Sequence, residues 1–130
     1  MKRQSILYIG LGLSLLTAVL DYIGTILYLY WTTGWYDYMT HFLGGLTIGV
    51  LIIWALRLEA RSLKSFLLVF LGVMIVGGAW EVFEYLIGAI SPIQSYEVDT
   101  VHDLIMDALG AFVAFWFATT PTSISQSQES

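Results

Sequence analysis

Four apolar runs, each long enough to cross a bilayer, constrain this chain more than any other feature. A transmembrane helix needs about 20 mostly apolar residues to cross the hydrocarbon core. Soluble domains carry roughly 25% charged residues, whereas this chain has 12% charged and 58% hydrophobic residues. We therefore predict an all-α integral membrane bundle of four helices in a single domain over residues 1–118. Its expected spans are residues 6–30, 39–56, 66–90 and 99–118.

The two ends of the chain need separate interpretations. The basic start, Lys2 and Arg3, followed by an apolar run also fits a secretory signal peptide. No small residues at cleavage-site spacing lie around residues 18–21, so we expect a membrane span instead. Residues 119–130 are polar, and we expect a disordered cytoplasmic tail there.

All five basic residues fall on one side of the predicted bundle, because they lie before the first span and between the second and third. By the positive-inside rule this side is cytoplasmic, so the predicted orientation places both termini inside. The turns at residues 31–38 and 91–98 then face outward. We expect Ser91-Pro92 to stop the third helix and Asp99 or Thr100 to cap the fourth. The basic residues are Lys2, Arg3, Arg57, Arg61 and Lys64.

Each predicted helix carries one stripe of small and polar residues spaced by three and four, which places them on one face. Small residues let membrane helices approach closely, and polar side chains face the bundle interior. We interpret Gly45-x-x-x-Gly49 as packing within the chain, with dimerisation as the alternative. The stripes are Gly10, Ser14, Thr17, Asp21, Thr25 and Tyr28; Asp37, His41, Gly45 and Gly49; Gly77, Glu81, Glu84 and Gly88; and Asp99, Asp103, Asp107, Gly110 and Ala114.

Depth along the helices predicts where the acidic residues meet. With a rise of about 1.5 Å per residue, acidic and histidine side chains from all the spans fall at one level in the outer half of the membrane. His102 is a further candidate, because it adjoins Asp103 in the sequence. The expected site residues are Asp21, His41, Glu81, Glu84, Asp103, Asp107 and His102.

The outer half of the predicted bundle has no Lys or Arg to balance these acids. Several carboxylates in a low-dielectric site cannot all stay ionised without a counter-charge. That charge is supplied by a divalent metal, a cationic ligand or shared protons; alternatively, the acids are hydrogen-bonded groups that hold helices together. Carboxylates with His suit Mn, Fe or Zn, and oxygen ligands suit Mg. We expect a divalent metal, with its identity open among these four.

Three motifs, taken together, resemble a known family. They are Asp37-x-x-x-His41-Phe-Leu-Gly-Gly, Trp80-Glu81-x-Phe-Glu84, and Asp99-x-x-x-Asp103-x-x-x-Asp107-x-x-Gly110-Ala111. The set resembles the YjdF-like family of small bacterial and archaeal inner-membrane proteins, whose function is unknown. A weaker resemblance extends to VanZ-like proteins. The resemblance implies a helical bundle with functional acids in a prokaryotic inner membrane, and it implies no established reaction.

Three functions follow as alternatives. The first is a metal-dependent protein, an enzyme acting on lipid or cell-envelope head groups, because the expected site lies near the outer leaflet. The second is a small cation or proton-coupled transporter. The third is an accessory structural subunit of a membrane complex. The lipid bilayer is the expected partner, with no nucleic acid and no organic cofactor. Catalytic residues, and the choice between a homo-oligomer and a complex with other proteins, stay open.

Overall fold

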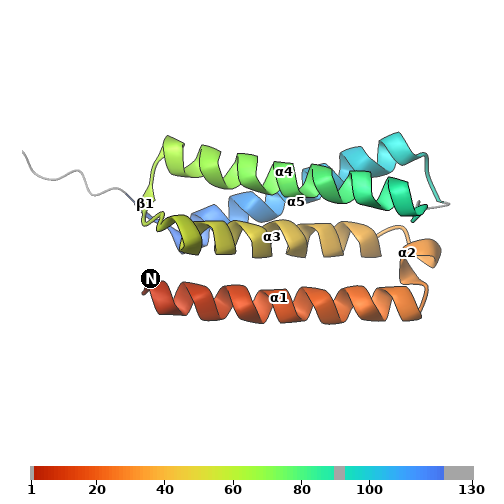
Figure 1. The fold of residues 1–130 in the computed structure, drawn as a ribbon, viewed down its shortest axis with the longest axis horizontal. Coiled ribbons are helices and arrows are strands. Elements are labelled where there is room, and N and C mark those ends of the chain that lie inside the picture. Colours follow the sequence, from red (N-terminus) through yellow and green to blue (C-terminus); the bar gives the residue numbers. More distant parts are fainter. Residues whose placement is uncertain (1, 90–92, 122–130) are drawn as a thin grey trace, which may run out of the picture.

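The computed structural model describes residues 2–89 and 93–121 and consists almost entirely of helix (Figure 1). Four of its helices are long and apolar enough to cross a membrane. The predicted all-α membrane bundle is therefore confirmed. The long helices are α1 (Arg3–Ile26), α3 (Tyr36–Leu56), α4 (Leu63–Ile87) and α5 (Tyr96–Ala118); the short elements are α2 (Leu29–Thr32), β1 (Ala60–Arg61) and β2 (Thr120–Pro121). The two short strands pair in parallel.

The helices begin earlier than the apolar runs that predicted them. Each long helix starts three residues before its expected span, because its first turn is built from polar or interfacial residues. The N-cap of α5 is Ser95, so the prediction of Asp99 or Thr100 as the cap is wrong. Asp99 lies instead inside the first turn of α5 and is buried.

Two left-handed residues set helix ends that the sequence interpretation misplaced. Gly88 has φ +74° and ends α4 at Ile87, since glycine adopts this conformation without a Cβ penalty. The helix thus ends before it reaches Ser91-Pro92, so the prediction that this dipeptide stops the helix is wrong. Residues 91 and 92 themselves lie outside the described residues. Tyr28, with φ +57°, separates α1 from α2 and interrupts the first predicted span. Residues 122–130 of the predicted tail also lie outside the described residues.

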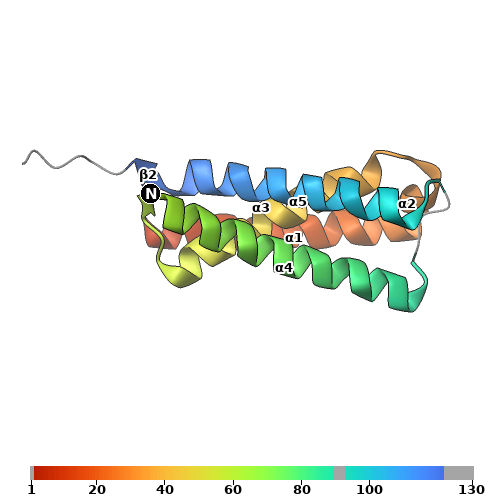
Figure 2. The same ribbon diagram turned by 90° about the horizontal axis from the view of Figure 1, so that it is seen from above.

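Helix α3 lies at the centre of the bundle. It packs along α5 on one side and against α1 on another, while α4 contacts both α5 and α3 (Figures 1 and 2). The start of α1, the α3–α4 loop with β1, and β2 after α5 lie at one end of the bundle. That end carries all five basic residues of the chain, and we call it the basic end. We call the opposite end the outer end, because we expect from the sequence that it faces outward; the orientation itself stays a prediction.

Close approach of α3 and α5 depends on glycine. A Cβ added at Gly45 would lie 2.7 Å from the Cα of Asp107, and one at Gly110 would lie 2.5 Å from the amide nitrogen of Leu46. Carbon atoms normally pack about 3.5–4.0 Å apart, so any side chain at these positions would force the two backbones apart. At Gly49 an added Cβ would lie 2.7 Å from the Cβ of Ala114. The interpretation of Gly45-x-x-x-Gly49 as packing within the chain is confirmed.

The half of the bundle nearer the basic end has a hydrocarbon core. Its buried side chains come from all four long helices and contact one another: Ile6, Val50, Ile53, Val69, Val73, Ala111, Ala114 and Ala118. Val69 and Val73 are fully buried there. The buried acids lie on the other side of this core, toward the outer end. The bundle is thus divided into an apolar half and a polar half.

We predict that Gly110→Ala destabilises the bundle, because its methyl group would overlap the backbone of α3. Overpacking of this kind lowers the free energy of unfolding by about 1–3 kcal/mol. The matched control is Gly78→Ala, since nothing lies within 4 Å of a Cβ added at Gly78. Thermal denaturation in detergent micelles measures both. Equal melting temperatures for the two variants would contradict the account of the α3–α5 contact.

Candidate metal centre

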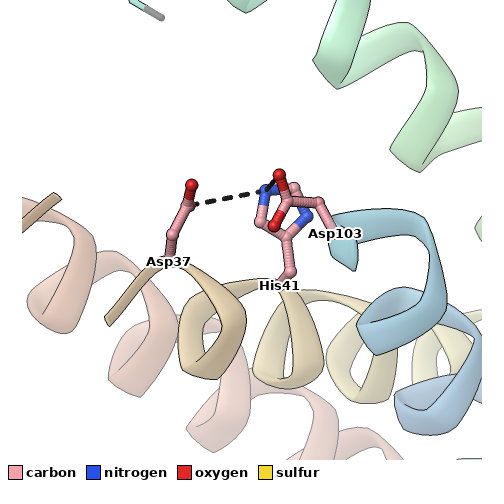
Figure 3. Close-up of side chains that lie close together, drawn as sticks. All are labelled: Asp37, His41 and Asp103. Carbon is pink, nitrogen blue, oxygen red and sulfur yellow. Dashed lines mark ion pairs between the residues drawn. The ribbon is translucent and has the colours of Figure 1, made fainter. Parts of the chain in front are cut away.

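The imidazole of His41 lies at the centre of a buried polar cluster toward the outer end of the bundle. The residue is 7% exposed. Its Nε2 atom faces three carboxylates: Asp37 Oδ1 at 3.7 Å, Glu81 Oε1 at 3.6 Å and Asp103 Oδ2 at 4.0 Å. Figure 3 shows Asp37 and His41 rising from one helix, with Asp103 reaching toward them from another. Three helices, α3, α4 and α5, therefore converge on one ring nitrogen.

Helical spacing explains why these side chains meet. Asp37 and His41 are four residues apart on α3, and Asp103 and Asp107 are four residues apart on α5, so each pair shares a helical face. Both faces continue into the glycine contact between the two helices, at Gly45 on α3. The contact that brings the backbones together thus also brings the polar side chains of the next turns toward each other.

Asp107 holds the other side of the imidazole. Its Oδ2 atom lies 3.4 Å from His41 Nδ1, and the residue is 3% exposed. The carboxylate occupies space that only glycine leaves free, because a Cβ at Gly77 would overlap it. When Nδ1–H donates to Asp107, the Nε2 lone pair faces the three other carboxylates. A carboxylate orients metal-binding histidines in this way.

Two buried oxygens of the cluster have no hydrogen-bond partner among the described residues: Glu81 Oε1 and Asp103 Oδ1. Glu81 is anchored through its other oxygen, which accepts a 2.8 Å hydrogen bond from the Thr100 hydroxyl. A buried acceptor without a partner costs about 1–3 kcal/mol, and more when it is charged. The basic residues lie at the far end of the bundle and cannot neutralise it. The cluster therefore needs a cation or protons.

The distances around Nε2 are compatible with a shared ion. They run from 3.6 to 4.0 Å, beyond the roughly 2.7–3.2 Å of an N–H···O hydrogen bond. Ligand atoms that each lie about 2.0–2.2 Å from one ion are themselves about 3–4 Å apart. Two sets of three residues have potential metal-ligand atoms within 4.8 Å of one another. One set is Asp37, His41 and Asp103, and the other is His41, Glu81 and Glu84.

Most of the predicted site residues come together, and two lie apart. His41, Glu81, Glu84, Asp103 and Asp107 share the cluster described above. Their role as metal ligands stays a prediction.

Asp21 and His102 lie outside this cluster. The exposed Asp21 carboxylate accepts a 2.8 Å hydrogen bond from the Tyr30 hydroxyl and lines the neighbouring cavity. His102 is exposed, and its ring packs against Tyr38 with centroids 5.3 Å apart.

Asp37 is the cluster residue that the predicted set lacked. It was placed in the turn before the second span, although its spacing of four from His41 already indicated a shared face. The helix α3 begins at Tyr36 and carries Asp37 into the cluster. The signal was therefore present in the sequence, and the error lay in the expected start of the helix.

A cavity of about 370 Å³ adjoins the cluster. Asp37, His41 and Glu84 line its outer part, together with Asp21 and Tyr30. From there the cavity extends between α1 and α4 over the face of α3. The cluster is thus open to a space large enough for a small ligand.

We predict that Asp103→Asn stabilises the protein when divalent metal is removed by a chelator. The amide keeps the shape of the side chain and removes one of several neighbouring buried negative charges. A gain of about 1 kcal/mol corresponds to a rise of about 4 °C in melting temperature. The control is Asp21→Asn, where the carboxylate is exposed and little change is expected. A lower melting temperature for Asp103→Asn in chelator would show that the charge is already balanced within the protein.

Comparison with known proteins identifies a family of predicted membrane proteins. A family model described as "Predicted membrane protein (DUF2238)" matches residues 4–122. This range contains α1 except for its first residue, the whole of α3, α4 and α5, and every residue of the cluster. The match agrees with the resemblance to the YjdF-like family, while the weaker resemblance to VanZ-like proteins stays a prediction. No curated protein and no solved structure gives a significant match.

Proposed function

The chain belongs to the DUF2238 family of predicted membrane proteins, and we propose that it binds one divalent cation at His41. The observation that carries this proposal is the set of three carboxylate oxygens 3.6–4.0 Å from Nε2. His41, Asp37, Glu81 and Asp103 would hold the ion. Asp107 would orient the imidazole from the opposite side.

Charge supports the same assignment. Glu81 Oε1 and Asp103 Oδ1 are buried without a hydrogen-bond partner among the described residues, and a cation between the carboxylates would satisfy such oxygens. One nitrogen donor with several carboxylates suits Mn, Fe or Zn, whereas Mg prefers oxygen ligands alone. We propose one of these four ions, and direct metal analysis distinguishes them.

The cavity supports an enzymatic role on lipid or envelope head groups. Catalytic metal sites keep one ligand position open to substrate, and Asp37 and His41 border the cavity directly. A bound ion polarises an oxygen of the molecule beside it. Glu84 also lines the cavity, and its side chain offers a donor atom within 4.8 Å of those of His41 and Glu81. Glu84 is therefore the residue we propose to accept or donate a proton there.

The proposal includes an orientation. We propose that the basic end faces the cytoplasm and that the cluster lies in the outer half of a prokaryotic inner membrane. The grouping of Lys2, Arg3, Arg57, Arg61 and Lys64 at one end of the bundle supports this orientation.

The transporter alternative has less support from the packing. A transported ion would have to cross the half of the bundle nearer the basic end, where Val50, Ile53, Val69 and Val73 form a close-packed apolar core. The cavity reaches only to the level of Ser14 and Ile48. The third alternative, an accessory subunit of a membrane complex, stays a prediction.

We predict that His41→Ala abolishes binding of one equivalent of divalent metal, because it removes the central ligand. His102→Ala is the matched control, since the second histidine is exposed and packs against Tyr38 outside the cluster. Asp107→Asn should weaken binding by about 10–100-fold, the usual effect of losing a group that orients a ligand. Inductively coupled plasma mass spectrometry of the purified protein and calorimetric titration with Mn²⁺ and Zn²⁺ measure these effects.

The wild-type result decides the proposal. One equivalent of a divalent metal, retained in His102→Ala and lost in His41→Ala, supports it. Wild-type protein that neither contains nor takes up metal, or a His41→Ala variant that binds metal as tightly as His102→Ala, would refute it.

A further inference from the structure

The cavity beside the cluster has two chemically different ends. Its outer end has the acids and His41 described above. Its inner part, toward the middle of the bundle, runs between Ala18 of α1 and Val76 of α4, over Gly44 and Ile48 of α3. The length of the cavity therefore passes from charged side chains to hydrocarbon.

The polar atoms of the inner part already have partners. The Ser14 hydroxyl donates to the Gly10 carbonyl at 2.8 Å, and the Thr47 hydroxyl donates to the Leu43 carbonyl at 2.7 Å. These hydroxyls therefore do not need water or a polar ligand as a hydrogen-bond partner. What the inner part offers to a ligand is chiefly methyl and methylene groups, which suit a hydrocarbon chain.

The cavity also faces the lipid side of the bundle. In Figure 1, α1 and α4 lie on opposite sides of α3. Residues of both α1 and α4 line the cavity. Ala18, Val76 and Trp80 on its two walls are exposed at the protein surface. In a membrane such a surface contacts lipid tails, so a chain can enter sideways from the bilayer without crossing the protein.

The charge of the outer end selects among head groups. Four carboxylates line the cavity, those of Asp21, Asp37, Glu84 and Asp107, and no Lys or Arg is among its described lining residues. A divalent ion balances two negative charges, which leaves an excess of negative charge at this end. An anionic head group would add to that excess, whereas an ammonium group would reduce it.

We propose that this cavity binds one alkyl chain of a zwitterionic phospholipid that carries an ammonium group. The chain lies between α1 and α4, the ammonium group faces the outer carboxylates, and the phosphate is the group that reaches the cation. The inference rests on the proposed metal site for its head-group contact, and it names the substrate class of that site.

Native mass spectrometry of the detergent-purified protein tests the inference. The probes are phosphatidylethanolamine and phosphatidylglycerol with identical acyl chains, added separately and in competition. Ala18→Phe and Val76→Phe fill the cavity from its two walls. Ala79→Phe is the matched control, because Ala79 is an exposed alanine of α4 that does not line the cavity. The metal content of every variant is measured in parallel.

We expect one phosphatidylethanolamine to be retained by the wild type and by Ala79→Phe, at least tenfold more than phosphatidylglycerol. Both cavity-filling variants should lose this lipid and keep their metal, which also shows that they are folded. Equal retention of the two lipids, or undiminished retention in both Ala18→Phe and Val76→Phe, would overturn the inference. Loss of metal from all preparations would instead refute the metal site, so the two failures are distinguishable.

Discussion

The close approach of α3 and α5 is the constraint on which the rest of the structure depends. Gly45 and Gly110 allow the two backbones to touch, with an added Cβ at Gly45 only 2.7 Å from the Cα of Asp107. This contact places Asp107 beside the imidazole of His41, which lies one turn from Gly45. Asp103, one turn before Asp107 on α5, then faces the opposite ring nitrogen. The same glycines that allow the helices to pack therefore determine the geometry of the polar cluster.

The lipid environment determines how the charge of the buried carboxylates can be balanced. A hydrocarbon solvent cannot hydrate buried carboxylates, so their charge has to be balanced inside the bundle. The basic residues are held at the opposite end, beyond the apolar core formed by side chains such as Val69 and Val73. Asp107 directs the imidazole so that its second nitrogen faces three carboxylates, an arrangement that accommodates a cation. A cavity lined by Asp37, His41 and Asp107 adjoins that position.

Much of this arrangement was predictable from the sequence, because hydropathy and helical spacing are local signals. The four spans follow from apolar length, and the stripes identified His41, Glu81, Asp103 and Asp107 as residues that meet. Spacing alone could not distinguish a ligand from a residue that orients one, since that depends on the rotation of the imidazole ring. Asp37 was missed because α3 begins earlier than its apolar run. The end of α4 was misplaced because a left-handed glycine, Gly88, ends the helix before the proline signal.

The central claim is that His41 Nε2 and its facing carboxylates share one metal ion. Anomalous diffraction from crystals grown with Zn²⁺ or Mn²⁺, recorded at the absorption edge of the metal, tests it most directly. The account predicts a single anomalous peak about 2.0–2.2 Å from Nε2 and in contact with the carboxylates of Glu81 and Asp103. No peak at this position, with Nε2 instead hydrogen-bonded to one carboxylate at about 2.7–3.2 Å, would contradict it and identify the cluster as a protonated ion-pair network.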